Sequence, residues 1–119
     1  MAGYTTSSNL DKVIGEAEKN KLFDSDADVI AYYINTASSM LWARICGRQD
    51  IVGNSAMWPG DYDTDADPYP SLHYHCDMLT IDLGRWRKGG KAVDDEHPSL
   101  KWGEDVRMNR ADVVADKDT

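Results

Sequence analysis

Residues 28–51 read DVIAYYINTASSMLWARICGRQDI and contain the longest helical pattern in the chain. Apolar side chains recur there at intervals of three and four residues, which is typical of an α-helix with one wide buried face. Ala37, Ser38 and Ser39 in its middle are small enough to let a second helix come close, and Gly47 follows as a left-handed stop. One such helix cannot bury its face alone, so the stretch predicts a packing partner. The positions on or beside this face are Val29, Ile30, Tyr33, Ile34, Ala37, Met40, Leu41, Arg44 and Ile45.

The predicted partner is a helix over residues 71–88, which follows Pro70 and ends at Gly89 and Gly90. Its apolar side chains also share one side, and basic residues gather in its last turn, where the helix dipole favours them. The two helices are predicted to form a long antiparallel pair joined by a long loop over residues 48–70. The apolar positions of the partner helix are Leu72, Cys76, Leu79, Leu83 and Trp86.

A shorter helix is predicted before this pair. The apolar side chains between residues 10 and 17 have helical spacing, with Ser8 as the expected cap. Residues 1–8 are expected to be mobile or to lie on a neighbouring subunit. Asp24 or Ser25 is expected to cap the long helix that follows. The predicted fold class is therefore mostly α, a small helical bundle.

The chain beyond Gly90 has a different character. It is rich in charge, and its apolar side chains are sparse. A segment of this kind is expected to become ordered on a partner, so residues 91–119 are predicted to be an extended C-terminal arm that follows a helical domain over residues 1–90. The side chains expected to bind that partner are Leu100, Trp102, Val106 and Met108.

Length, charge and cysteine content limit the classes of function. The net charge of -8 argues against phosphate binding as the main activity, because nucleic-acid binders need a basic face. No apolar run approaches the length of a membrane span, and the first residues lack the order of a signal peptide, so no contact with a membrane is expected. Cys46 and Cys76 are expected to be free thiols on helices, which favours a reducing cytoplasm.

An alternation of carboxylates in the sequence GDYDTDADPYP is the most conspicuous local pattern. Asp61, Asp63 and Asp65 match the first oxygen ligands of a calcium-binding EF-hand loop. The match then fails, because Ala66 replaces the turn glycine and Leu72 replaces the bidentate glutamate. We expect a solvated acidic loop or a contact to a basic neighbour, and no metal or other cofactor.

Candidate catalytic groups are weak throughout. His73 and His75 are two positions apart on a helix and point to nearly opposite sides, so they cannot share a zinc ion. Cys76 lies in a helix interior, without the exposure or helix N-terminus that activates a thiol. No serine sits in a nucleophile turn, and no glycine loop is placed to cradle a phosphate. The sequence predicts no catalytic residue and no enzyme.

Three aromatic residues are candidates for contacts between subunits. Tyr32 and Trp42 fall off the most apolar stripe of the long helix, and Trp58 lies in the loop. Aromatic side chains left outward would form a patch that needs a partner. Packing of all three within the chain is the alternative.

In the order of its predicted helices and in their residue patterns, the chain resembles the head-tail connector, or adaptor, proteins of long-tailed bacteriophages. That family has a helix of the form Asp-x-x-x-Ile-x-x-Ala-Ser-x-x-Ile-x-x-x-Leu-x-x-Arg-Tyr, a loop with prolines, and a second helix of the form Leu-x-x-x-Cys-x-Asp-Ile-Ala-x-x-x-Leu. The resemblance covers residues 9–90, and Gln49 stands where an aromatic residue usually follows the arginine. The matching positions are Asp28, Tyr32, Ile34 to Ala37 and Ser38, Leu41, Ile45, Arg48, Leu72, Cys76, Asp77 and Leu79 to Leu83.

The resemblance implies a structural virion protein in the neck between capsid and tail, made in the host cytoplasm. Such adaptors form a ring, here expected to be dodecameric, that docks on the portal protein, extends the DNA channel and offers a surface to the tail or to a tail-terminator or stopper protein. The C-terminal arm of the family inserts against the portal, and an acidic lumen would let DNA slide through without specific binding. The alternatives are a cation-dependent interaction module built on the acidic loop, and an acidic inhibitor that mimics DNA.

Overall fold

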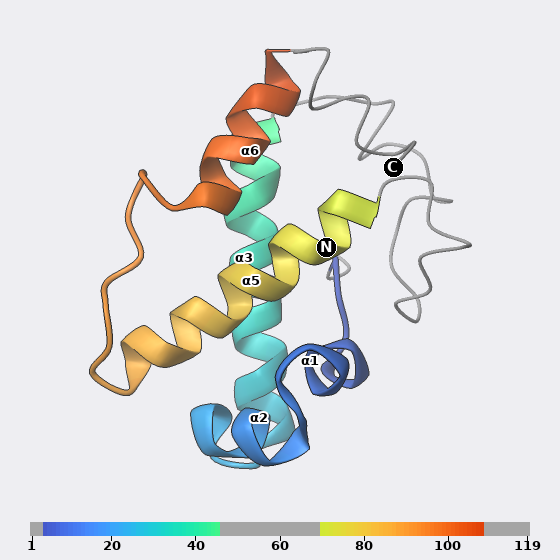
Figure 1. Cartoon of the computed structure of the whole chain (residues 1–119), viewed down its shortest axis with the longest axis vertical. Helices are drawn as coiled ribbons and strands as arrows, with labels where there is room; N and C mark the ends of the chain where they lie inside the picture. Colours follow the sequence, from blue (N-terminus) through green and yellow to red (C-terminus); the bar gives the residue numbers. More distant parts are fainter. Residues whose placement is uncertain (1–3, 46–69, 109–119) are drawn as a thin grey trace.

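The computed structural model describes residues 4–45 and 70–108, which are largely helical and contain no strand (Figure 1). This confirms the predicted fold class, mostly α and a small helical bundle. The helices in chain order are α1 (Ser7–Ile14), α2 (Glu16–Phe23), α3 (Ala27–Ile45), α5 (Pro70–Arg87) and α6 (Pro98–Arg107).

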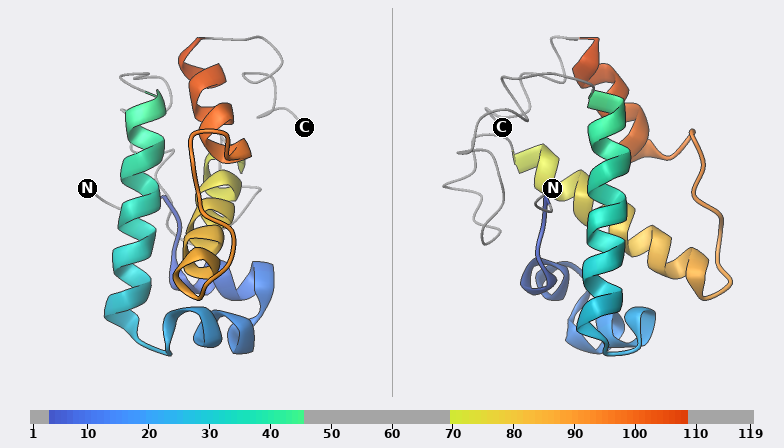
Figure 2. Two further views of the ribbon diagram at one scale, coloured as in Figure 1. Left: turned by 90° about the vertical axis from the view of Figure 1, so that its left-hand side faces the viewer. Right: turned by 180° about the vertical axis from the view of Figure 1, so that it is seen from behind.

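The long helix α3 is the axis around which the others pack. α5 crosses it obliquely and in the opposite sense, and α6 lies beside its C-terminal half (Figures 1 and 2). Ile30, Ile34, Leu41 and Ile45 of α3 are buried, as the spacing predicts. At the crossing, the Ser38 hydroxyl lies 3.5 Å from the sulfur of Cys76, so small side chains do admit α5 closely.

Two apolar clusters fill the interior. One lies between α1, α2 and the first half of α3, with Ile81 of α5, and the other lies between α3, α5 and α6. Tyr33 packs against both clusters and links them. The first consists of Leu10, Leu22, Phe23, Ile30, Ile34 and Ile81. The second consists of Tyr4, Ala37, Leu41, Ile45, Cys76, Leu79, Leu83, Val93, Leu100, Trp102 and Val106.

The predicted first helix is two helices, because Gly15 interrupts it. Gly15 has φ 86°, a left-handed conformation that side-chain-bearing residues rarely adopt, and it ends α1 before α2 begins. The cap of α1 is Thr6 rather than Ser8: the Thr6 hydroxyl accepts a hydrogen bond of 3.3 Å from the backbone N–H of Asn9. The residues before α1 are not all mobile or lent to a neighbour, since Tyr4 is fully buried.

The cap of α3 is Asp26, whereas Asp24 or Ser25 was predicted. Asp24 and Ser25 both have left-handed backbones, with φ 59° and 54°, and they reverse the chain after α2. The Asp26 carboxylate accepts hydrogen bonds from the N–H groups of Asp28 (2.9 Å) and Val29 (3.4 Å), which otherwise have no partner in the first turn.

The end of α5 is as predicted. Gly89 has φ 93°, and the N–H of Gly90 donates to the carbonyl of Arg85 at 2.8 Å, which closes the helix. Residues 88–97 then leave the body of the molecule and return to the start of α6 (Figure 1). We call this segment the strap.

The prediction of an extended arm over residues 91–119 is wrong for residues 98–107, which form α6. The ring nitrogen Nδ1 of His97 accepts a hydrogen bond of 3.1 Å from the N–H of Ser99, and Pro98 occupies the first turn, where its missing N–H costs nothing. Leu100, Trp102 and Val106 are 1%, 8% and 1% exposed. Helix α6 therefore shares one core with α3 and α5.

Candidate functional site

The outward face of α3 is uncharged and open. The sequence carries no charged residue between Asp28 and Arg44, although 29% of the chain is charged. Tyr32 is 63% exposed, and its ring makes an edge contact with Tyr33 at 5.1 Å between ring centroids. Seen from behind, α3 lies in front of α5 and α6 (Figure 2). A shallow groove of about 510 Å³ on this surface, which we call the α3 face, is lined by Tyr32, Asn35, Thr36, Ser39, Met40 and Ala43.

The predicted subunit contacts fall on or near this face where the structure describes them. Trp42 is 38% exposed and, like Tyr32, points away from the core. Trp58 lies outside the described residues. The subunit role of these side chains stays a prediction, but both Tyr32 and Trp42 are accessible for it.

Most of the predicted portal contacts are not accessible. Leu100 and Val106 are buried against α3 and α5, and Trp102 stacks on His75 with 4.6 Å between ring centroids. None of the three could reach a partner unless α6 left α3. Met108 is the exception, because it is 54% exposed just past the end of α6. The sequence interpretation failed here because it treated sparse apolar residues as contacts to a partner.

A buried polar cluster ties the N-terminal segment to the helix pair. The N–H of Tyr4 donates to the Ser38 hydroxyl at 3.0 Å, and the Thr5 hydroxyl donates to the Asp77 carboxylate. Asp77 is 1% exposed. Burial raises the pKa of Asp77 to about 6, opposed by the Thr5 hydrogen bond and the nearby charge of His73. We call these contacts the N-terminal clasp, and no sequence pattern indicated them.

Cys76 next to this clasp is a packing residue. It is fully buried, and burial raises the pKa of its thiol to about 12. The thiolate is the reactive form of cysteine, so a thiol held protonated in the core is not a nucleophile at neutral pH. The predicted burial of Cys76 is confirmed, and Cys46 lies outside the described residues.

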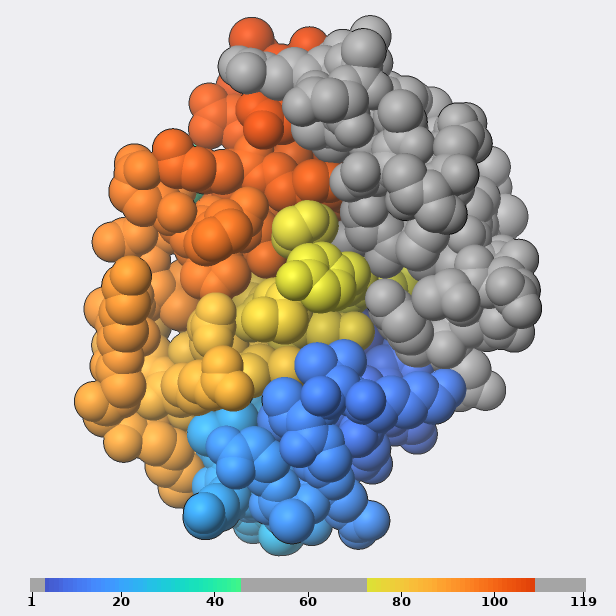
Figure 3. Space-filling model, in the orientation of Figure 1, coloured from blue at the N-terminus to red at the C-terminus, as the bar shows by residue number. Residues whose placement is uncertain are grey.

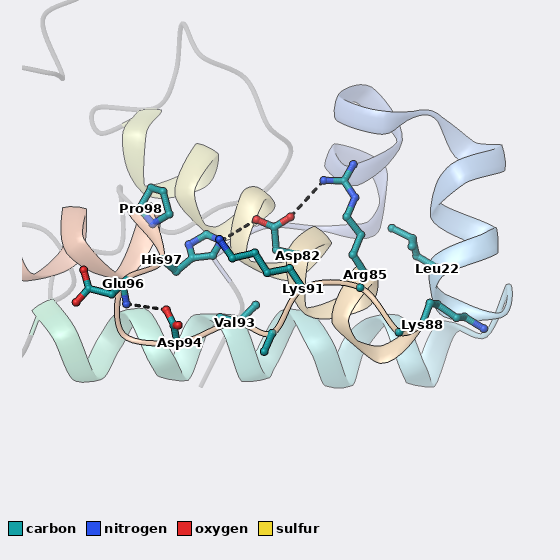
Figure 4. A pocket seen from close by; sticks show the side chains of 13 residues that line it. Leu22, Asp82, Arg85, Lys88, Lys91, Val93, Asp94, Glu96, His97 and Pro98 are labelled. Carbon is teal, nitrogen blue, oxygen red and sulfur yellow. Dashed lines mark hydrogen bonds and ion pairs between the residues drawn. The ribbon is translucent and has the colours of Figure 1, made fainter.

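A pocket of about 640 Å³ lies between the strap, α5 and the start of α6 (Figure 4). His97 Nε2 is 2.7 Å from the Asp82 carboxylate, which also accepts from Arg85 at 3.2 Å. Because His97 Nδ1 accepts from Ser99, Nε2 must carry the proton and donate to Asp82. The strap, drawn in orange, forms one edge of the molecule in Figure 3. We call this hollow the strap pocket.

Helices α2 and α5 are joined beside this pocket by an ion cluster. The Asp24 carboxylate lies 2.6 Å from both Arg87 and Lys88. Hydrogen bonds from these two side chains lower the pKa of Asp24 to about 2. Lys88 lines the strap pocket, and its ion pair with Asp24, which is not a lining residue, fixes its position.

No metal centre or membrane segment is found in the part of the chain that the structure describes. Within residues 4–45 and 70–108, no group of three or more histidine, cysteine, aspartate or glutamate side chains is placed to hold a metal ion. None of the described helices combines the length and apolar character needed to cross a bilayer. The weak candidate ligands Asp61, Asp63 and Asp65 lie outside these residues.

Comparison with known protein families, curated proteins and solved structures finds no match to this chain.

Proposed function

We propose that this chain is a structural head-tail adaptor of a long-tailed phage, which assembles as a ring on the portal, extends the DNA channel and offers a surface to the tail. The sequence resemblance over residues 9–90 supports this function, and the small helical fold agrees with it. The single observation that carries the proposal is the uncharged, aromatic-bearing α3 face.

Charge explains why this face suits contact between copies. Each chain carries a net charge of -8, so two copies repel each other at most approaches. The α3 face lies between Asp28 and Arg44, where the sequence has no charged side chain that would repel a second copy. Exposed aromatic side chains are frequent anchors of interfaces, and the small side chains of Thr36 and Ser39 on this face leave room for a neighbouring backbone. A heterologous contact of this kind, repeated by rotation, closes a ring.

The portal contact differs from the one that the sequence indicated. Because Leu100, Trp102 and Val106 hold α6 in the core, Met108 alone of the four remains available. We therefore assign portal docking to the surface at the end of α6. The proposal includes no catalytic role, since the buried Cys76 is not a nucleophile and the carboxylates of the strap pocket are engaged with neighbouring side chains or backbone.

The test of the α3 face is a pair of matched variants. Tyr32→Glu places a charge on the face, whereas Tyr74→Glu makes the same change at a tyrosine of α5 that is 51% exposed and also makes an edge contact with its neighbour, at 5.0 Å between centroids. Light scattering should show that Tyr32→Glu lowers the assembly mass while Tyr74→Glu leaves it unchanged. Equal assembly by both variants would exclude the α3 face as the contact.

Two further measurements test the alternative functions. A persistent monomer that competes with DNA for a basic enzyme would support a DNA mimic. A melting temperature that rises with calcium, and no longer does so after Asp63→Asn and Asp65→Asn, would support the cation-dependent module.

A further inference from the structure

The strap presents unpaired backbone next to a pocket. The backbone N–H and carbonyl groups of Lys91, Ala92 and Val93 make no hydrogen bond to any residue that the structure describes. Only Val93 in this run is buried, at 9% exposed, and it anchors the strap to the larger apolar cluster. An anchored, extended segment with free backbone groups can accept a further strand.

One positively charged side chain that lines the strap pocket has no partner among the described residues. Several charged side chains line the pocket. Among them, Lys91 alone makes neither an ion pair nor a hydrogen bond to the residues that the structure describes. A ligand of the pocket is therefore expected to bring a carboxylate to Lys91. The engaged groups are Asp82 with His97 and Arg85, Lys88 with Asp24, Glu96 with Lys101, and Asp94 with the N–H of Glu96.

We propose that the strap pocket binds residues 111–116, ADVVAD, of a neighbouring copy, added beside the strap as an extended strand. This inference depends on the assembly proposed above and names one of its contacts. Alternate side chains of an extended segment point to opposite sides. Ala111, Val113 and Ala115 then fit the apolar lining of the pocket. Asp112 and Asp116 project from the other side of the strand, where the long side chain of Lys91 can reach around the strand to one of them. The apolar lining includes Leu22, Val93 and Pro98.

Reach favours a neighbouring copy over the same chain. Helix α6 has 10 residues and so is roughly 15 Å long, and the strap joins its first end while the chain leaves from its last. In Figure 1 the last turn of α6 points away from the strap. Val113 is five positions beyond Met108 and can lie at most about 17 Å from it. Within one chain the segment would have to return fully stretched along the whole of α6.

The test uses a fluorescent peptide of residues 109–119 and the full-length protein, diluted until light scattering shows monomers so that no neighbouring copy fills the pocket. Fluorescence anisotropy should show saturable binding to the unaltered chain and to Lys12→Glu, the same charge change on α1, away from the pocket. Binding should be about tenfold weaker with Lys91→Glu, and equally weaker for a peptide carrying Asp112→Lys and Asp116→Lys. The altered peptide should regain affinity for the Lys91→Glu protein. Absence of saturable binding, or binding that Lys91→Glu leaves unchanged, would overturn the inference.

The outcomes are distinguishable from those of the proposed function. Rings in electron micrographs without peptide binding would remove this contact and leave the adaptor function standing. Peptide binding by a chain that never forms rings would support binding at the strap pocket and contradict the proposed ring assembly.

Discussion

Asp77 is a residue through which the stability of the fold depends on pH. Its carboxyl is buried under the N-terminal clasp, and its pKa is raised to about 6 from an ordinary value of 3.8. Between these values the folded state binds more protons at this site than the unfolded state does. The contribution of Asp77 to stability is therefore full below about pH 4 and is lost as pH rises through 6.

Replacement of Asp77 by asparagine should remove this dependence. The asparagine side chain stays neutral at every pH, so the free energy of unfolding, relative to the unaltered protein, should shift in favour of Asp77→Asn by up to about 3 kcal/mol between pH 4 and pH 7. Urea denaturation at pH 4, 5.5 and 7 measures the difference. Thr5→Val, which deletes the donor that opposes the shift, should steepen the pH dependence. Parallel stability curves for all three proteins would contradict the role of Asp77.

The position of some residues in the fold can be predicted from the sequence alone, and that of others cannot. The outward position of Tyr32 follows from helical spacing, because neighbours four residues apart define the faces of α3. The Thr5 to Asp77 hydrogen bond joins residues separated by 72 positions, and no local pattern records such a pair. The strap pocket was missed for the same reason, since the His97 to Asp82 contact depends on how the strap returns to α6.

At the scale of the element, α6 is what changes the interpretation. Its signals were present in the sequence: Pro98 in the first turn, and Leu100, Gly103 and Val106 at intervals of three. High charge and few apolar residues masked them. Gly103 allows the close approach, because a Cβ there would lie 2.9 Å from the Cβ of Arg44 in α3.

Truncation of Trp102 tests whether α6 is core or arm. Trp102→Ala should lower the free energy of unfolding by about 3 to 5 kcal/mol, since it empties a large buried volume. Trp86→Ala, at a tryptophan that is 47% exposed, should cost less than about 1 kcal/mol. Chemical denaturation followed by far-UV circular dichroism gives both values. An unaltered stability for Trp102→Ala combined with lost portal binding would restore the arm interpretation.

The long helix and its partner show what periodicity does supply. The ends of α5 and the buried stripe of α3 follow from spacing, Pro70 and Gly89, because those signals are local. Two caps were misplaced by one or two residues, and Gly15 divided a helix that the apolar pattern ran through. These errors arise where a helix end is set by backbone conformation and not by the polarity of the side chains.

At the scale of the whole molecule, two truncations define where the fold ends. A chain ending at Met108 should keep its helical circular dichroism and melt within a few degrees of the full chain, because the described core closes at Val106. A chain ending at Asp95 lacks α6 and should lose cooperative unfolding, since it exposes the second apolar cluster. Similar melting of the two truncated chains would show that α6 does not complete the core.

The assembly of copies is the central claim, and electron microscopy of the purified chain, alone and mixed with the portal protein of the same genome, tests it most directly. We predict rings with an open centre, alone or seated coaxially on portal particles, and their loss in the Tyr32→Glu variant. Monomers in both samples, with no density added to the portal, would contradict the adaptor function.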